Sequence, residues 1–253
     1  VYTLAPAVTM EDCGELATAG AFLGVPHPPG YPIWTMLVWV FTKIFSFVTF
    51  RGQPNPAWSV ALASAVFGAL ASGITAMLIC RSGIDIISQI KSRAQFIGQS
   101  TENVFCWIGG VSASLLFAFS PISWSQSVIV EIYSLNSLFL VLVMILAYVW
   151  MRRQSDRMLI LLSFVFGMGM TNYQGILLLM PALIIVILLH NIALFRDFVV
   201  ASIPYAAVYV LIKFGYLPPL LHPTHATCFI YLTLNLLAIV LIYYFLPNGK
   251  AVS

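Results

Sequence analysis

The chain has 253 residues, of which 61% are hydrophobic and 8% are charged, whereas soluble domains carry about 25% charged residues. This composition excludes an ordinary soluble domain and predicts an all-α, polytopic membrane protein, because several apolar runs approach the roughly 20 residues that a bilayer-crossing helix needs. The net charge of +3 comes from scattered basic residues rather than a basic run, so nucleic acid is not an expected partner.

The first residues and the cysteines set two further expectations. The chain begins with Val1 rather than Met, and residues 1–7 are typical of the last turn of an apolar segment. We therefore expect this chain to be part of a longer one. The four cysteines show neither a CxxC pair nor a Cys/His ligand spacing, which indicates neither a zinc site nor a disulfide framework. We expect all of them to be free thiols: Cys13, Cys80, Cys106 and Cys228.

An acidic stretch near the start of the chain is the first candidate site. Three of the 8 acidic residues lie within five positions, at Glu11, Asp12 and Glu15, and carboxylates near a membrane usually mark a substrate, ion or proton site. Two structural alternatives stay open. Residues 9–12 (TMED) fit a helix-capping pattern, and the acids also suit a solvated rim at the positive end of that helix. A cap explains one carboxylate but not three.

Residues 1–56 are predicted to form a first outer loop with interfacial helices. Residues 16–24 predict a brief helix that Gly24 ends. The proline-rich segment 26–32 carries His27 and cannot form a regular helix, because each proline removes a donor and pushes its predecessor toward extended geometry. Residues 33–50 are apolar and suit either a crossing or an interfacial helix.

Residues 57–253 are predicted to form the membrane-spanning helices of a single domain. Small residues spaced by four in the span 57–80 suit close helix contact, and a polar connection is expected over 81–102. A polar bend is expected over 122–130, before a helix that runs through 150. The remaining predicted spans are 104–119, 158–170, 175–189, 198–216 and 229–246. The segments 158–170 and 175–189 are short, so we expect thin or tilted helices that meet at a polar tip.

The distribution of basic residues orients the chain. If residues 33–50 do not cross the membrane, eight of the 11 basic residues lie on one side and three on the other, in accord with the positive-inside rule. We therefore predict that this segment is interfacial or re-entrant. The acidic stretch, His27, Glu131 and the tip at 172–174 then share the outer side, where they would line an extracytoplasmic cleft.

Several single residues have a structural alternative beside the functional one. Glu131 suits either a second acid of the site or a charge favoured by a helix start, and Asn172 suits either the cleft or a helix break. His222 and His225 are interpreted as loop residues. Four tryptophans fit an interfacial aromatic belt better than a sugar platform: Trp34, Trp39, Trp58 and Trp124.

A series of short motifs resembles a known family. The motifs are residues 12–16 (DCGEL), 23–32 (LGVPHPPGYP), 55–58 (NPAW), 119–126 (FSPISWSQ), 131–136 (EIYSLN) and 171–172 (TN). Their order and spacing resemble a bacterial family of multi-spanning proteins that is related to the protein O-mannosyltransferases and belongs to the GT-C glycosyltransferases. The resemblance covers roughly the first 180 residues.

The resemblance implies transfer of a sugar from a polyprenyl-phosphate-linked donor at the outer face of a bacterial inner membrane. Asp12 matches the expected catalytic base, which takes a proton from an acceptor hydroxyl, and Glu15 and Glu131 match further acidic positions. No metal ligand is assigned, and a divalent cation is left open as a cofactor. The implied substrate-binding residues, some of which would donate to the leaving phosphate, are His27, Tyr31, Tyr133, Asn172 and Gln174.

Whether the chain is itself an enzyme stays open. The leading hypothesis is an extracytoplasmic GT-C glycosyltransferase or its membrane half, with membrane lipids and further subunits as partners. The alternative is a non-catalytic structural subunit of a larger membrane complex, because the family's usual downstream helices are missing and Cys13 stands where a small hydroxyl residue is usual. A transporter is disfavoured, since the predicted spans lack an acidic residue near mid-membrane.

Overall fold

A computed structural model describes residues 2–9, 12–91 and 99–216, together with five residues further on: Phe229, Thr233, Leu236, Leu237 and Val240. Glu11, His222, His225, Cys228 and most of the predicted span 229–246 lie outside the described residues. Contacts group the chain into two compact units, Val1–Met180 and Pro181–Ser253. The prediction of a single domain stays a prediction.

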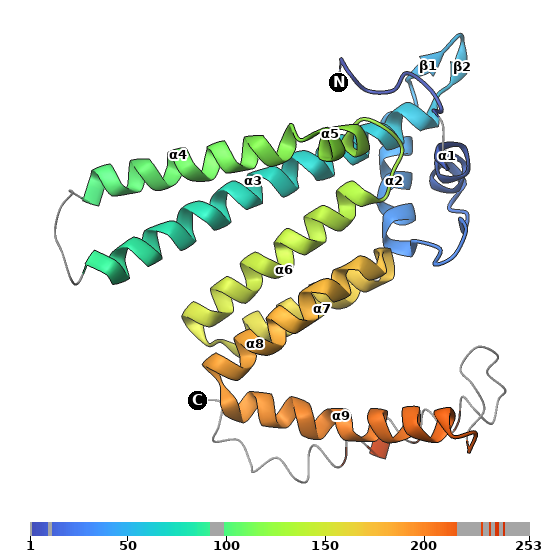
Figure 1. The fold of residues 1–253 in the computed structure, drawn as a ribbon. Helices are drawn as coiled ribbons and strands as arrows, with labels where there is room; N and C mark the ends of the chain where they lie inside the picture. The colour runs from blue at the N-terminus through green and yellow to red at the C-terminus, as the bar shows by residue number, and fades with distance from the viewer. Residues whose placement is uncertain are drawn as a thin grey trace. The chain divides into compact units, whose positions relative to one another are not determined.

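The described part is almost entirely helical, so the all-α prediction is confirmed (Figure 1). Its strands are β1 (Thr49–Phe50) and β2 (Gln53–Pro54), which pair antiparallel as a small hairpin. Two described helices are long and apolar enough to cross a membrane, Pro56–Ile90 and Tyr133–Arg153, and a third candidate is the bent pair Ser100–Ala118 and Pro121–Ser127. The chain is therefore a helical membrane protein.

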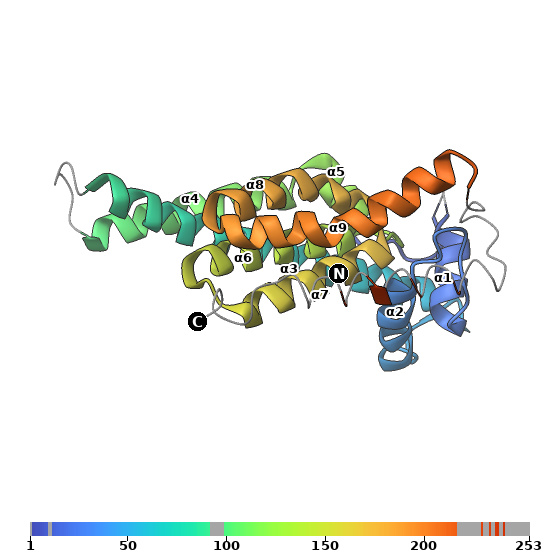
Figure 2. The same cartoon turned by 90° about the horizontal axis from the view of Figure 1, so that it is seen from below.

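The first outer segment contains α1 (Cys13–Phe22) and α2 (Pro32–Ile44), which lie at the N-terminal end of α3 in both views (Figure 1, Figure 2). Gly24 was expected to end α1, but Leu23 takes the left-handed conformation one residue earlier, and the Gly24 N–H bonds the carbonyl of Ala19. The segment before α2 is irregular, as the prolines predict. Proline occupies the first turn of α2, where a helix needs no amide donor.

The α2 helix is short for a crossing. Its 13 residues rise about 20 Å, whereas the hydrocarbon core is about 30 Å thick. An interfacial or re-entrant position suits this length, and it stays a prediction.

The helices α3 (Pro56–Lys91) and α4 (Gln99–Ala118) run side by side (Figure 1). The prediction of a polar connection over 81–102 is wrong for 81–91 and 99–102, which are helical. Residues 81–91 contain no proline and include four isoleucines, so nothing in their sequence ends α3 early. Small residues let α3 and α4 pack closely against each other. At Gly110, for example, a Cβ would lie only 2.6 Å from the Ala76 carbonyl oxygen.

The helix α5 (Pro121–Ser127) replaces most of the expected polar bend over 122–130. Its N-cap is Ser120, whose side chain accepts from the Ser123 N–H, and proline follows in the first turn, a combination that favours a helix start. The axis turns by 66° between α4 and α5, so the chain still changes direction where the bend was expected.

The first unit continues with α6 (Tyr133–Arg153), α7 (Asp156–Asn172) and the 3-10 helix η1 (Gln174–Leu179). At the far end of α6, Asp85 of α3 accepts a hydrogen bond from the Tyr148 hydroxyl and lies 3.3 Å from an Arg152 guanidinium nitrogen. This contact ties α3 to α6 at the end remote from α1. The α7 helix has 17 residues, in keeping with a short or tilted helix.

The second unit contains most of α8 (Met180–His190) and all of α9 (Ile192–Lys213). Asn191 separates them, and its side chain accepts from the Leu194 N–H at 2.9 Å as the N-cap of α9. The predicted span 198–216 therefore begins six residues earlier than expected, because this cap supplies the helix start.

Candidate active site

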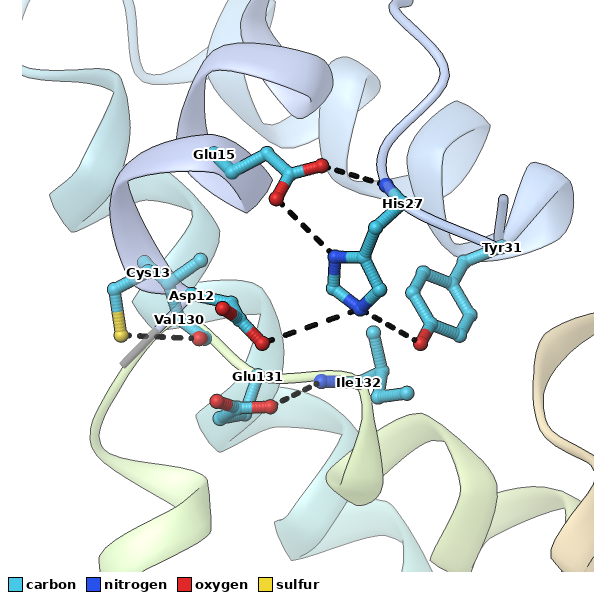
Figure 3. Close-up of polar contacts among 8 residues, drawn as sticks. All are labelled: Asp12, Cys13, Glu15, His27, Tyr31, Val130, Glu131 and Ile132. Atoms are coloured by element: carbon cyan, nitrogen blue, oxygen red, sulfur yellow. Dashed lines mark hydrogen bonds and ion pairs between the residues drawn. The ribbon is translucent and has the colours of Figure 1, made fainter. Parts of the chain in front are cut away.

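His27 lies at the centre of a polar cluster beside the N-terminus of α1 (Figure 3). One carboxylate oxygen of Glu15 accepts the His27 backbone N–H at 2.6 Å, and the other lies 3.2 Å from Nδ1 of the ring. The backbone hydrogen bond, followed by the one from the ring, lowers the pKa of the Glu15 carboxyl from its ordinary value of 4.5. Glu15 therefore stays ionised and orients the ring.

The other ring nitrogen of His27 faces Asp12 and Tyr31. Nε2 lies 3.2 Å from the Tyr31 hydroxyl and 3.9 Å from a carboxylate oxygen of Asp12. In a neutral ring whose proton is on Nδ1, Nδ1 donates to Glu15 and Nε2 accepts a hydrogen bond from the Tyr31 hydroxyl. In a protonated ring, both nitrogens donate. The cluster can therefore hold a proton at a fixed place.

The capping interpretation of Asp12 is wrong. Asp12 stands at the N-cap position of α1, but its side chain makes no capping hydrogen bond, and it is 64% exposed. Its carboxylate turns instead toward His27 (Figure 3). Exposure leaves this carboxylate accessible to a group that arrives from solvent.

Glu131 is held in the loop before α6 by contacts to its backbone. Its carbonyl accepts from the Trp34 indole N–H at 3.3 Å and from the Ser64 hydroxyl at 3.1 Å. The placement of Trp34 in an interfacial belt is therefore wrong, since the side chain is fully buried with its N–H bonded. The Glu131 side chain is also buried, and one carboxylate oxygen accepts the Ile132 N–H at 3.3 Å. That bond fits the helix-start alternative as well as a role in the site.

Cys13 joins the start of α1 to the segment that carries Glu131. Its thiol accepts from the Thr9 hydroxyl at 2.9 Å and donates to the Val130 carbonyl at 3.3 Å. The residue next to Asp12 is thus bonded to the residue next to Glu131. The prediction of free thiols is confirmed for the described cysteines Cys13, Cys80 and Cys106.

The environment of Tyr31 shows that distant parts of the sequence meet. Burial, followed by the nearby Tyr133 and Tyr173 hydroxyls and the Asp12 and Glu131 carboxylates, raises the pKa of the Tyr31 hydroxyl above its ordinary value of 10.0. These groups come from three segments separated by about forty to a hundred residues along the chain. The first loop, the loop before α6 and the end of α7 therefore converge around Tyr31.

Tyr173 was placed on the outer side with the polar tip at 172–174, but it was not among the predicted substrate-binding residues. Its ring meets the Tyr133 ring edge to face, with centroids 5.5 Å apart. From that tip, Asn172 and Gln174 were assigned to substrate binding instead. Asn172 is fully buried, with no hydrogen-bond partner for its amide among the described residues, and Gln174 is exposed and makes no polar contact with the described residues of the cluster.

Asp12, Glu15 and His27 are the described residues that could hold a metal ion, since one ligand atom from each lies within 4.8 Å of the others. Carboxylate and imidazole ligands suit several divalent cations. Both Glu15 oxygens already contact His27, so a cation bound to Glu15 would share an oxygen that already takes part in one of these contacts. The assignment of no metal ligand stays a prediction.

The fold and the cluster define the class: a helical membrane protein with a histidine held between two carboxylates beside its spanning helices. The family model described as Protein O-mannosyl-transferase TMEM260 N-terminal domain matches residues 12–195. The chain belongs to this family. The matched range includes all of the predicted site residues, and it supports the O-mannosyltransferase-like part of the resemblance but not its bacterial or GT-C part.

Two curated relatives are similar to the chain. Protein O-mannosyl-transferase tmem260 of Dictyostelium discoideum is 26% identical over 69% of the chain and 20% of the relative. Protein O-mannosyl-transferase TMEM260 of Mus musculus is 34% identical over 57% of the chain and 17% of the relative. The chain thus spans about a fifth of the length of these relatives. Both organisms are eukaryotes, which gives no support to a bacterial inner membrane. No solved structure matches the chain.

Proposed function

We propose that this chain forms part of a glycosyltransferase that moves a mannose from a polyprenyl-phosphate-linked donor to a hydroxyl group of an acceptor protein. The proposal is supported by the names of the relatives, which are protein O-mannosyl-transferases, and by membership of the family with that N-terminal domain. The single observation that carries it is the pair of carboxylates, Asp12 and Glu15, on the two sides of His27.

Asp12 acts as the general base in this proposal. The acceptor oxygen forms a bond to the anomeric carbon while the bond from that carbon to the phosphate oxygen breaks. The bonding electron pair leaves with the polyprenyl phosphate, and Asp12 takes the acceptor proton, a transfer that needs hydrogen-bond reach. The exposure of its side chain suits this role.

Glu15, His27 and Tyr31 position the reacting groups. Glu15 fixes the ring of His27 through two contacts, and Nε2 then faces the Tyr31 hydroxyl. A protonated His27, or the Tyr31 hydroxyl, would donate to the oxygens of the leaving phosphate, where negative charge develops. Glu131 is assigned as a second, orienting acid.

The proposed site faces the extracytoplasmic side. The 21 residues of α6 rise about 32 Å, close to the roughly 30 Å thickness of the hydrocarbon core. Tyr133 and the basic pair Arg152 and Arg153 therefore lie at opposite ends of one crossing. The positive-inside rule places the basic end in the cytoplasm, so the cluster beside Tyr133 faces outward.

A transfer assay tests the proposed function. The intact protein in lipid nanodiscs is given polyprenyl-phosphate mannose and an acceptor protein, and mannosylated acceptor and released polyprenyl phosphate are measured together. We expect the two products in equal amounts, and none from a nucleotide-linked mannose. Binding of partner proteins without any transfer would contradict the proposal and favour the structural-subunit alternative.

A further inference from the structure

A pocket of about 160 Å³ lies among α3, α4, α5 and α6, and five serines line it. Residues three and four apart share one face of a helix, so Ser120, Ser123 and Ser127 present one row and Ser134 and Ser137 present a second. The two rows meet where the Ser127 and Ser134 hydroxyl oxygens lie 3.3 Å apart. The pocket therefore carries serines from two helices on a lining whose surface is mostly apolar.

Some polar groups of this pocket have no partner in the described chain. Gln126 also lines the pocket, and its side-chain oxygen is buried without a hydrogen bond. The hydroxyls of Ser123 and Ser137 make no hydrogen bond to described residues, whereas Ser120 and Ser127 donate to carbonyls of the preceding turn, as serines in helices often do. A buried amide oxygen without a donor costs about 1–3 kcal/mol, and a ligand with hydroxyl groups would supply that donor.

The pocket's remaining lining restricts the class of ligand. None of the lining residues is charged, and Phe117 and Tyr133 add aromatic surface. Its volume of about 160 Å³ is below the range of drug-sized sites, about 300–1,000 Å³, so the ligand must be small. Gly68 lets Ser127 approach α3 closely, because a Cβ there would lie 2.5 Å from the Ser127 hydroxyl oxygen. A neutral ring with many hydroxyl groups and apolar C–H faces fits this lining better than a phosphate does.

We propose that this pocket binds the neutral pyranose ring of a sugar, with ring hydroxyls bonded to Gln126, Ser123 and Ser137. The inference rests on the proposed function, because a mannosyltransferase must hold such a ring near its base. Tyr133 connects the pocket to the cluster around His27. It lines the pocket and also lies close enough to Tyr31 to raise the pKa of the Tyr31 hydroxyl. Neither Asp12 nor Glu131 lines the pocket, so sugar binding and proton transfer are separable.

Equilibrium binding of polyprenyl-phosphate mannose to the intact protein in nanodiscs tests this inference. Loss of one hydrogen bond is worth about 1 kcal/mol, or about fivefold in Kd. We expect Gln126→Leu to weaken binding at least fivefold and Ser123→Ala with Ser137→Ala to do the same. The melting temperature of Gln126→Leu should not fall, because its buried oxygen has no partner to lose. Ser125→Ala is the matched control, since Ser125 lies exposed on the same helix and does not line the pocket.

Three ligands distinguish the source of the ring. If the variants weaken binding of polyprenyl-phosphate mannose but not of polyprenyl phosphate, the pocket holds the sugar of the donor. If they weaken binding of methyl α-mannoside to the same extent, the pocket also takes free sugars. The inference is overturned if the variants weaken binding of polyprenyl phosphate as much as binding of polyprenyl-phosphate mannose. It is also overturned if no variant changes binding. Asp12→Asn should bind the donor as the wild type does. If transfer is found but Gln126→Leu binds normally, the pocket assignment fails while the proposed function stands.

Discussion

The candidate site depends on one imidazole whose two nitrogens face different partners. Glu15 contacts Nδ1 and the backbone N–H of the same residue, while Tyr31 and Asp12 face Nε2. Asp12, Glu15 and His27 could be selected from the sequence, because acidic residues and a proline-bound histidine are rare in so apolar a chain. Trp34 and Ser64 could not, since their partner Glu131 lies about seventy to a hundred residues away in the chain.

The hydrogen bonds that the Glu15 carboxylate accepts from the backbone N–H and then from the ring of His27 predict a pH dependence of stability. The folded-state pKa of Glu15 lies below 4.5, so the contact stabilises the fold above about pH 4.5 and is lost as the pH falls through the lowered pKa. Melting temperatures from pH 3 to 7 should therefore fall more steeply on the acid side for the wild type than for Glu15→Gln. Asp156→Asn, outside the cluster, is the control, and identical acid profiles for wild type and Glu15→Gln would contradict the assignment.

The backbone anchors of Glu131 predict a coupled loss of stability. Ser64→Ala removes one hydrogen bond to the buried Glu131 carbonyl, which costs about 1 kcal/mol of unfolding free energy. Trp34→Phe removes the other bond. The double variant leaves that carbonyl unbonded by either side chain, so its loss should exceed the sum of the single losses.

Equilibrium unfolding in detergent measures this coupling. Ser88→Ala is the control, because Ser88 is exposed and bonds within its own helix turn. Strictly additive losses would show that the two bonds act independently and do not share the carbonyl.

At the scale of elements, the apolar periodicity and the proline positions predict most helices but not their ends. The predicted span 57–80 became a 36-residue helix, since residues 81–91 contain no stop signal and Asp85 gains partners on α6. The expected bend over 122–130 became α5 because Ser120 and Pro121 start a helix. Both differences arise where a cap or a tertiary contact decides the conformation of a polar segment.

Two neighbouring glycines of α4 give a test of the contact between α3 and α4. A Cβ on Gly110 would meet the Ala76 carbonyl at 2.6 Å and the Cys80 nitrogen at 3.2 Å, whereas nothing lies within 4 Å of one on Gly109. Gly110→Ala should lower the free energy of unfolding by about 1–3 kcal/mol, because backbone atoms must move apart. Gly109→Ala should be neutral or stabilise by up to about 1 kcal/mol through helix propensity. Equal effects of the two substitutions on the melting temperature would contradict the packing.

At the scale of the whole molecule, orientation in the membrane connects the charges to the site. The basic end of α6 and the Tyr133 end are separated by the length of one crossing. The side on which each end lies was predicted from basic residues alone, and the structure adds which loop residues are accessible. Asn55 is buried and its amide donates to the Pro6 carbonyl, so the exposed Gln53 is the better probe of the outer side.

Cysteine labelling in sealed vesicles of known orientation tests the topology. An impermeant maleimide applied from outside should react with Gln53→Cys and not with Gln154→Cys until the membrane is permeabilised. The described native thiols are buried, which keeps their background low. Outside labelling at Gln154→Cys would place the cluster at the cytoplasmic face and remove the basis for an outer-leaflet donor.

The role of Asp12 as the general base is the central claim, and single-turnover transfer by Asp12→Asn tests it most directly. Asparagine keeps the size of the side chain but cannot take the acceptor proton. Asp12 makes no capping hydrogen bond, so the melting temperature and the Kd for the donor should stay at wild-type values. The rate of mannose transfer should fall by about 10²-fold or more, the scale of a lost general base. Transfer by Asp12→Asn at the wild-type rate, with folding and donor binding intact, would contradict the mechanism.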